Sequence, residues 1–413
     1  MSELSLTPQR CALGPPSPAS GRGSYLWAAL DARTPTCFSL AMAGNRATLL
    51  IMAGDGIGPE VLAESRRIAE WFILRRGLAA ELTEELFGLA AYRKHGRLLR
   101  EDALARMRAA DAILFGATGG LSYAELPPEV GKSDSLLRIR KSLDLYANLR
   151  PIKALPALAE ASTLKARARE GTDLVIVREL SSGIYFGEPR GVETLPDGRK
   201  RGVNTHSYTS DEIERVARVA FELARKRRNH VTSVDKANVM EAGKLWREVV
   251  EALHAADYAD VGLAHMLADN CAMQLVRAPH QFDVLLTDNL FGDLLSDAAA
   301  MIAGSLGMLP SASLGPVGPD GRRPALYEPV HGSAPDIAGR GIANPLGAIL
   351  SLALALEWSL GRPADARLLE SAVARALDEG ARTADIMHPG AKQVSTRGMG
   401  DAVLASLERL ARG

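Results

Sequence analysis

The sequence predicts an α/β fold whose sheet contains parallel strands. Short apolar runs at residues 48–53, 112–115 and 172–178 alternate with stretches of helical periodicity, which is typical of parallel strands joined by helices. Hydrophobic residues make up 47% of the 413 positions and charged residues 24%, as in ordinary globular proteins. That length suits two or three domain-sized units or one large α/β body.

The composition argues against several kinds of partner. Lys plus Arg and Asp plus Glu both number 49, so no net charge favours a nucleic acid or an anionic membrane. The most apolar stretch, residues 344–361, contains Glu357 and is bounded by Asn-Pro and Gly, which indicates a buried core helix and no membrane span. The three cysteines lack the spacing of zinc ligands and indicate a reducing compartment, so we expect a cytoplasmic protein.

Residues 1–46 differ from the rest of the chain. The first 23 are rich in Ser, Pro and Gly and have no periodicity, which predicts a disordered N-terminal extension. Their arginines and scarce acids faintly resemble a transit peptide, but no clear amphipathic helix follows. A further interpretation is that the functional chain begins near Met42. We favour a dispensable extension.

The first predicted strand leads into a glycine-rich turn at residues 54–60. This turn looks like a dinucleotide-binding loop, but Pro59 stands where that motif needs its third glycine. A tight turn without ligand is the alternative. We expect a helix from Pro59 to about Gly77, a strand over residues 81–87 and a helix over residues 101–109.

Three arginines are candidates for binding an anion. Arg140 and Arg150 lie in residues 136–151, where apolar residues occur at helical spacing, and Arg178 ends the predicted strand 172–178. The planar guanidinium matches carboxylates and phosphates. For each arginine taken singly, a surface salt bridge is the alternative.

Residues 187–207 contain strand-like pieces around a Pro-Asp-Gly turn, which predicts a protruding hairpin. A helix then opens with a capping box from Thr209 to Glu212 and ends in a basic cluster. The following strand, residues 230–234, leads to Lys236. A lysine there can carry a proton if it is buried, and a salt bridge to Asp235 is the alternative.

Three aspartates are candidate metal ligands or members of ion pairs. Asp269 falls among apolar neighbours in the helical stretch 267–276 and requires a partner. Asp293 and Asp297 follow a buried strand at residues 282–286 and lie on one face of a helix, because they are four residues apart. The spacing alone fits a solvated acidic helix start as well as a divalent-metal site.

The last part of the chain is expected to supply a ligand-binding loop. Residues 304–323 are rich in Gly, Pro and Ser and predict a loop. Residues 328–339 contain His331 and Asp336 among small residues, which permit close approach to a ligand. An acidic side chain can accept both ribose hydroxyls of an adenosine.

Taken together, the motifs at residues 54–60, 178–190, 233–239, 289–297 and 331–336 resemble the β-decarboxylating dehydrogenases of the isocitrate and isopropylmalate dehydrogenase family. The resemblance runs from about Thr48 to the C-terminus. It implies two domains that share a large mixed sheet, not a Rossmann fold, and a homodimer with composite active sites. The cofactor-binding domain would comprise residues 47–145 and 304–413, and the substrate and dimerisation domain residues 146–303.

The resemblance also implies roles for individual residues. Asp293 and Asp297, with Asp269 from the partner subunit, would hold Mg²⁺ or Mn²⁺. Tyr185 and Lys236, the lysine again from the partner, would be the acid and the base. The substrate would be bound by Arg140, Arg150, Arg178, Asp269 and an apolar pocket of Leu136, Leu137 and Val239, and the cofactor by His331, Gly332, Ser333, Ala334, Asp336 and Asn344. Asp336 favours NAD, because a carboxylate repels a 2′-phosphate.

Within the family, residues 179–185 resemble the isopropylmalate branch, which implies oxidative decarboxylation of 3-isopropylmalate in leucine biosynthesis. Two features depart from that branch. Ser133, beside Asp134, occupies the position of a glutamate near the nicotinamide, and residues 119–128 lack a tryptophan-containing insertion. A related dehydrogenase for another 3-alkylmalate, D-malate or tartrate is therefore the first alternative, and a catalytically silent paralogue is the second.

Overall fold

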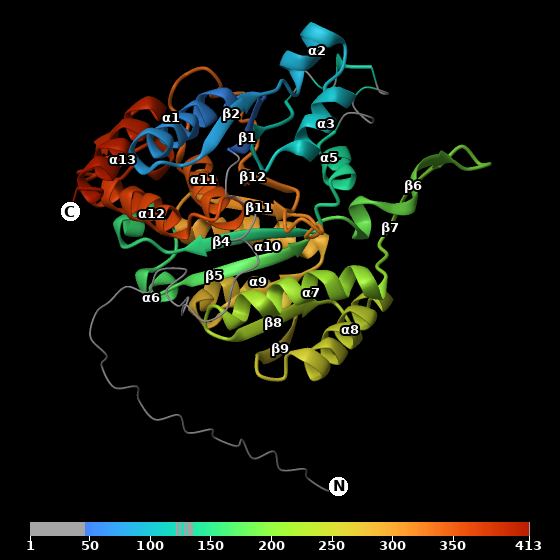
Figure 1. Cartoon of the computed structure of the whole chain (residues 1–413). Helices are drawn as coiled ribbons and strands as arrows, with labels where there is room; N and C mark the ends of the chain where they lie inside the picture. Colours follow the sequence, from blue (N-terminus) through green and yellow to red (C-terminus); the bar gives the residue numbers. More distant parts are fainter. Residues whose placement is uncertain (1–45, 121–122, 124, 128–129, 131–134, 413) are drawn as a thin grey trace, which may run out of the picture.

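The computed structural model describes residues 46–120, 123, 125–127, 130 and 135–412. The expected N-terminal extension, apart from Arg46, and the departure at Ser133 and Asp134 lie outside this part of the chain. Its centre is one mixed sheet of ten strands in the order β2-β1-β3-β12-β11-β4-β5-β10-β8-β9 (Figure 1). The strands are β1 (Ala47–Gly54), β2 (Ala80–Glu84), β3 (Ala112–Ala117), β4 (Ala147–Lys153), β5 (Asp173–Glu179), β8 (His230–Asp235), β9 (Gly262–Leu267), β10 (Val284–Thr287), β11 (Pro310–Leu314) and β12 (Ala325–Pro329).

The sheet consists of two parallel blocks joined by antiparallel strands. The strands β2, β1, β3 and β12 form one parallel block, and β5, β10, β8 and β9 form the other. Between them, β11 and β4 pair antiparallel with their neighbours. The predicted α/β class with parallel components is confirmed, and the shared mixed sheet is the one that the resemblance implied.

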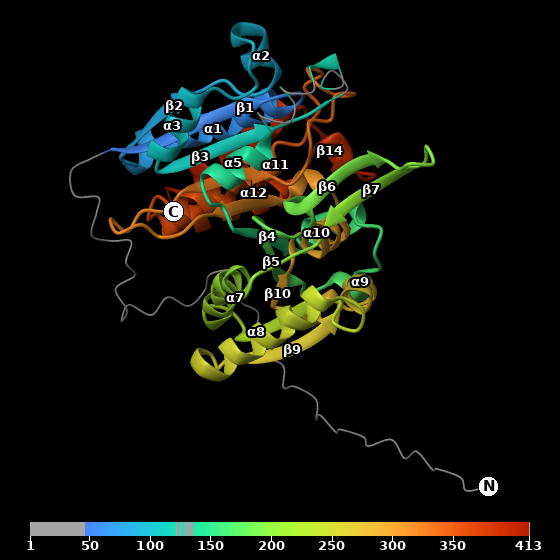
Figure 2. The same cartoon turned by 90° about the vertical axis from the view of Figure 1, so that its right-hand side faces the viewer.

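Helices cover both faces of this sheet (Figures 1 and 2). The cluster α1, α11, α12 and α13 packs around β1, β3, β11 and β12, whereas α7 packs on β5, β8 and β10, and α10 on β4 and β5. The longer helices are α1 (Gly58–Arg76), α7 (Ser210–Arg225), α8 (Glu241–Asp257), α9 (Ala268–Arg277), α10 (Asn289–Ala303), α11 (Leu346–Trp358), α12 (Pro363–Asp378) and α13 (Thr396–Leu410). The shorter ones are α2 (Leu89–His95), α3 (Glu101–Ala109), α5 (Leu136–Ser142) and α6 (Ala166–Arg169).

Local sequence signals explain several of these boundaries. The Thr209 Oγ1 accepts a hydrogen bond from the Glu212 amide at 3.4 Å, and Glu212 Oε2 accepts one from the Thr209 amide at 2.8 Å, so the predicted capping box starts α7. The helix α11 carries buried residues around its whole circumference, as a core helix does. In the described part of the chain, no helix has both the length and the apolar character that crossing a bilayer requires.

Two predictions about local structure were wrong. Residues 136–151 are not one helical stretch, because α5 ends at Ser142 and Arg150 lies on β4. Residues 304–323 are not all loop, because they contain a 3₁₀ turn (Leu306–Met308) and β11. In both cases pairing in the middle of the sheet decides the conformation, and a central strand needs no local alternation of polar and apolar residues.

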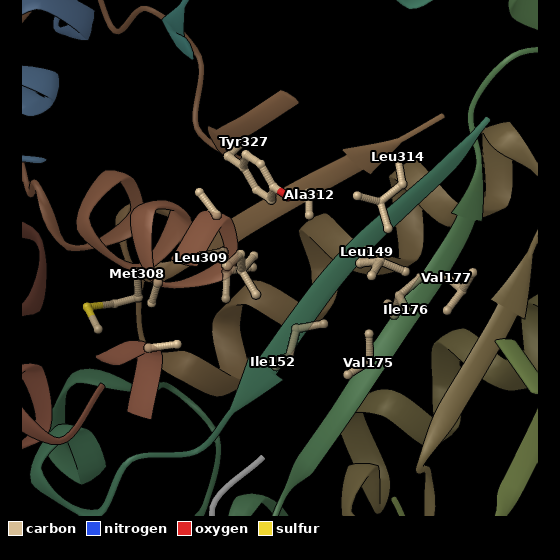
Figure 3. Packing of buried hydrophobic residues seen from close by; sticks show 14 of the residues in the cluster. Leu149, Ile152, Val175, Ile176, Val177, Met308, Leu309, Ala312, Leu314 and Tyr327 are labelled. Atoms are coloured by element: carbon tan, nitrogen blue, oxygen red, sulfur yellow. The ribbon is translucent and has the colours of Figure 1, made fainter. Parts of the chain in front are cut away.

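The interior is continuous through the centre of the sheet. Figure 3 shows Leu149 and Ile152 of β4, Ile176 of β5 and Leu314 of β11 packed into one apolar cluster. Each of these side chains is at most 2% exposed. A two-stranded hairpin of β6 (Gly187–Thr194) and β7 (Lys200–Thr205) extends from this body (Figures 1 and 2). A second small sheet pairs β13 (Ala381–Arg382) with β14 (Lys392–Gln393).

Candidate active site

The candidate site lies where three parallel strands end side by side. In the register of the sheet, Arg178 of β5 is opposite Thr287 of β10, and Thr287 is opposite Val234 of β8. The residues that follow these ends, Asn289 at the start of α10 and Lys236 after β8, therefore emerge at the same sheet edge. The carboxyl ends of parallel strands are where ligands bind in α/β sheets.

Arg178 is held in one place by α10. Its side chain is 2% exposed and donates to Asn289 Oδ1 from Nε at 3.1 Å and from Nη2 at 2.8 Å, while Nη1 donates to Asp293. A Cβ on Gly292 would lie 2.6 Å from Arg178 Cγ, so the arginine can pass along the helix only because that residue is glycine. Burial and the neighbouring Arg150 lower the pKa of Arg178 to about 10.

Arg150 approaches the same helix from β4. It donates to Asn148 Oδ1 at 2.8 Å and to Ser296 Oγ at 2.6 Å, and its Nη1 and Nη2 lie 3.2 Å from Asp297 and 3.3 Å from Asp293. The two aspartates thus share one helix face that meets two buried guanidiniums. The spacing of four residues predicted the common face. The structure shows that Arg150 and Arg178 lie opposite this face.

The two carboxyls nevertheless differ in their electrostatics. Burial raises the pKa of Asp293, but Arg178 and Arg150 together outweigh it and the pKa is lowered. At Asp297 burial is again the largest cause, Asp293 adds to it, and the pKa is raised despite Arg150. On the same helix face, the surroundings therefore stabilise the charged form of Asp293 and disfavour the charged form of Asp297.

Tyr185 completes this cluster. It lies in a 3₁₀ turn (Gly183–Tyr185), donates to Asp293 Oδ2 at 2.9 Å, and its ring centroid is 5.6 Å from Arg178 Cζ. Burial and the charge of Asp293 raise the pKa of the phenol, so Tyr185 keeps its proton at neutral pH.

Arg140 lies at the margin of the cluster. Its Nη2 is 3.4 Å from Glu328 Oε1, while its Nε is buried without a hydrogen-bond partner among the described residues. Its charge contributes to the lowered pKa of Asp293. A buried donor without a partner favours the binding of an anion at this position.

Lys236 and Asp269 form a second, separate group. Within the chain they pair with each other, and their side chains are 25% and 61% exposed. Lys236 Nζ donates a hydrogen bond to Asp269 Oδ1, and this bond lowers the pKa of the Asp269 carboxyl. In the part of the chain that the structure describes, no three His, Cys, Asp or Glu side chains form a metal-sized group, so Asp269 does not join Asp293 and Asp297 within one chain.

The residues expected to bind the cofactor lie on a loop pressed against the first glycine-rich turn. The Ile57 amide donates to the Ser333 carbonyl at 2.9 Å, and a Cβ on Gly56 would lie 1.9 Å from that oxygen. Burial lowers the pKa of His331, whose Nδ1 contacts the Gly332 carbonyl at 2.9 Å and whose Nε2 is buried without a described partner.

The other expected cofactor residues differ in accessibility. Asp336 and Gly332 are exposed, and Ala334 has a φ of +38°. Asn344 is buried; its Oδ1 accepts from the Leu346 amide at 3.0 Å and its Nδ2 donates to Asp385 Oδ2 at 3.0 Å, so it also fixes the start of α11.

The expected apolar pocket is only partly assembled. Leu136 and Leu137 are half-buried on the first turn of α5, whereas Val239 is 68% exposed. No described contact joins Val239 to the two leucines.

Comparison with known proteins places the chain among dehydrogenases. Residues 48–403 match the family described as isocitrate/isopropylmalate dehydrogenase. The chain belongs to this family. The chain is 60% identical over 366 residues to 3-isopropylmalate dehydrogenase 1 of Bradyrhizobium diazoefficiens, with 89% of this chain and 97% of the relative covered. It is 59% identical over 363 residues to the 3-isopropylmalate dehydrogenase of Gluconobacter oxydans, with 88% of this chain and 98% of that protein covered.

Two solved dehydrogenase structures are similar to this fold. Isocitrate dehydrogenase from Methylococcus capsulatus has a TM-score of 0.74 at 32% identity, covering 87% of this chain and 99% of that one. A β-decarboxylating dehydrogenase from Thermococcus kodakarensis in its apo form has a TM-score of 0.68 at 36% identity, covering 88% and 96%.

Sequence reasoning missed several polar residues that position the arginines of the candidate site. Asn289 binds Arg178, and Asn148 and Ser296 bind Arg150. Asn148 could have been found, because residues two apart on a strand share a face. The role of Asn289 had no local signal, since its partner is 111 positions away in the sequence.

Proposed function

We propose that the chain catalyses the NAD-dependent oxidative decarboxylation of 3-isopropylmalate to 4-methyl-2-oxopentanoate and CO₂, a step of leucine biosynthesis. The observation that carries the proposal is the convergence of two buried arginines and Tyr185 on Asp293 and Asp297. That arrangement offers cations for carboxylates, oxygen ligands for a metal and a protonated phenol within one cluster. The close relatives named 3-isopropylmalate dehydrogenase support the choice of substrate.

The three arginines would bind the two carboxylates of the malate. Arg150 and Arg178 are almost fully buried, so their interaction with an anion is weakly screened by water. Arg140 brings a buried Nε without a described partner. Guanidinium forks orient carboxylates as well as attract them, which fixes the substrate hydroxyl relative to the rest of the site.

The donor set fits a hard divalent cation. Asp293 and Asp297 would hold Mg²⁺ or Mn²⁺ together with Asp269 of the partner subunit, because such ions prefer carboxylate oxygens. When bound, the ion supplies Lewis acidity at the substrate oxygens. Both aspartates face arginines in the chain alone, so substrate carboxylates and metal would redistribute these contacts.

Two side chains would move protons. Lys236 of the partner subunit would accept the proton of the substrate hydroxyl as hydride leaves for the cofactor. Tyr185 would donate a proton to the carbon that loses CO₂. The raised pKa of Tyr185 fits this assignment, because an acid must hold its proton until the carbanion forms.

The loop after β12 fits a dinucleotide. His331 offers a buried, neutral nitrogen without a described partner, and exposed Asp336 offers a carboxylate to a ribose. Asp336 would favour NAD over NADP, since it repels a 2′-phosphate. Ser333 and Gly332 would place backbone groups close to the cofactor, and Asn344 would hold the loop through the start of α11.

A homodimer is part of the proposal. The neighbouring helices α9 and α10 expose large apolar side chains, namely Met273 (61%), Val276 (56%), Leu294 (62%) and Met301 (41%). Apolar side chains clustered on adjoining helices favour association. A second copy docked there would bring its own Lys236 and Asp269 toward Asp293 and Asp297.

The dimer proposal is tested by mixing inactive variants. Lys236→Ala and Asp297→Asn are each expected to abolish turnover. Refolded together, they form hybrids with one intact composite site, so activity should return to about a quarter of wild type. If both residues serve the site of their own chain, the mixture stays inactive and composite sites are excluded.

The choice of substrate is tested by assaying the purified protein with NAD, Mn²⁺ and each of 3-isopropylmalate, D-malate, tartrate and isocitrate. The highest kcat/KM is expected for 3-isopropylmalate. A preference for D-malate or tartrate would favour the alternative suggested by Ser133. Absence of NADH formation with all four would favour a catalytically silent paralogue kept for binding in the reducing cytoplasm.

A further inference from the structure

The carboxyl of Glu179 is a buried titratable group that has no role in the proposed reaction. Glu179 ends β5 directly after Arg178 and is 0% exposed. Burial raises the pKa of this carboxyl, against hydrogen bonds from Ser181 and Ser182 that lower it. A carboxyl buried at such a cost requires hydrogen-bond donors, and the turn that leads to Tyr185 supplies them.

Both carboxyl oxygens of Glu179 accept hydrogen bonds from this turn. Oε1 accepts from the Ser181 amide at 2.8 Å and from Ser181 Oγ at 2.6 Å, and Oε2 accepts from the Ser182 amide at 3.0 Å. Three donors on two oxygens fit an ionised carboxylate, which only accepts. A glutamine of the same shape would turn its NH₂ group toward one of these donors, so the turn requires the carboxylate.

The same turn is fixed to α7 and α10. Ser181 Oγ accepts from Arg215 Nη2 of α7 at 2.6 Å. The Ser182 carbonyl accepts from Asn289 Nδ2 of α10 at 2.9 Å. Because Asn289 Oδ1 accepts from Arg178, one amide side chain ties the turn to an arginine of the candidate site.

Tyr208 fills the space behind the turn. Gly183 has a φ of +72°, and a Cβ on it would lie 2.4 Å from Tyr208 Oη. That oxygen accepts from the Asn289 amide at 2.9 Å, and burial together with the charge of Glu179 raises the pKa of this phenol. The turn can close against Tyr208 only because residue 183 is glycine, and Tyr185 follows two residues later.

We propose that Glu179 is a positioning residue that fixes the phenol of Tyr185 against Asp293. Its carboxylate holds residues 181–183 in one conformation, and the 3₁₀ turn that begins at Gly183 carries Tyr185 to its 2.9 Å hydrogen bond with Asp293 Oδ2. The catalytic part of this inference rests on the proposed function, in which Tyr185 donates a proton. The positional part depends on no reaction.

The position of the phenol is measured by fluorine NMR on the full-length protein with a fluorotyrosine in place of Tyr185 alone. The signal of the folded protein should differ from that of the unfolded protein, because the ring lies beside Arg178 and Asp293. Glu179→Gln should move the signal toward the unfolded value. Glu64→Gln makes the same change at a 3% exposed glutamate on α1 and should leave the signal in place. An unchanged signal in Glu179→Gln overturns the inference.

Ser181→Ala is a milder perturbation of the same turn. It removes the hydroxyl donor and keeps both amide donors, so the signal should move in the same direction by a smaller amount. If Glu179→Gln does not fold, an unchanged signal in Ser181→Ala overturns the inference by itself.

Kinetics then separates positioning from a general loss of stability. Glu179→Gln should lower kcat about tenfold to a hundredfold, because a displaced group loses much of its contribution, while the KM for 3-isopropylmalate changes less than about threefold. If Glu179 acts through Tyr185, the double variant with Tyr185→Phe should turn over no more slowly than Tyr185→Phe alone. Additive losses, or a comparable loss in Glu64→Gln, contradict the role in catalysis. Normal turnover in Tyr185→Phe would instead refute the proposed acid, and the fluorine signal alone then decides the inference.

Discussion

Replacing Asp293 or Asp297 by asparagine makes the same chemical change at two positions of one helix, yet the structure predicts different effects on stability. Asp293 is the shared anion of Arg178 and Arg150, whose side chains are 2% and 8% exposed. Removing one partner of a buried ion pair costs about 3–5 kcal/mol. Because Asp293 is itself 31% exposed and asparagine keeps an acceptor for Arg178, we expect Asp293→Asn to lose about 2–3 kcal/mol of unfolding free energy.

Asp297 is expected to behave in the opposite way. Its side chain is 57% exposed, and burial together with Asp293 raises its pKa. A carboxyl whose pKa is raised by folding destabilises the folded state when it is ionised. Asp297→Asn should therefore leave the unfolding free energy unchanged or raise it by up to about 1 kcal/mol.

Urea unfolding at pH 7 without metal or substrate measures both changes, and turnover with Mn²⁺ measures the catalytic effect. Both variants should lose turnover about a hundredfold or more, because each removes a proposed metal ligand. Equal losses of stability would refute the argument from burial. Wild-type turnover in Asp297→Asn would refute its role at the metal and leave the fold and family unaffected.

Three further predictions concern protons and the cofactor. Lys236→Ala and Tyr185→Phe should lower turnover severely while NAD binding, measured by fluorescence titration, stays intact; near-normal turnover in either removes that residue from the mechanism. The folded-state pKa of Asp293 is lowered, so the ionised carboxylate stabilises the fold above about pH 4, and this stabilisation is lost as the pH falls further. The difference in unfolding free energy between wild type and Asp293→Asn should therefore become smaller below about pH 4. A difference that stays constant with pH would contradict the lowered pKa. Asp336→Arg should raise kcat/KM for NADP relative to NAD about tenfold or more, and an unchanged ratio would mean that Asp336 does not face the ribose.

Much of the fold could be predicted because its signals are local. The capping box at Thr209 correctly predicts the start of α7. The apolar run at residues 282–286 predicts a buried strand whose two ends lie within two residues of the ends of β10. Asp293 and Asp297 were placed on one face by their spacing alone. These features depend on periodicity and on contacts a few residues apart, which a single sequence contains.

The conformation of the central strands could not be predicted in the same way. Arg150 was expected in a helical stretch, but Asp144, with a φ of +47°, ends that stretch and β4 begins at Ala147. The strand β11 consists of Pro310, Ser, Ala, Ser and Leu314, a composition of low strand propensity. It is a strand because β12 and β4 pair with both of its edges, and those partners are not visible in its own sequence.

The sheet also explains why Asp269 lies apart from Asp293 and Asp297 within one chain. Asp235 is opposite Leu267 in the register of β8 and β9, so Lys236 and Asp269 emerge side by side and form their ion pair at the outer end of the sheet. The helix α10 instead packs inward on β4 and β5, which turns Asp293 toward Arg178. One chain thus places Lys236, the proposed base, and Asp269, the proposed third metal ligand, in an ion pair that is separate from Arg150 and Arg178. A second copy that reverses this direction is the simplest arrangement in which all the proposed groups meet one substrate, and this is why mixing inactive variants is decisive.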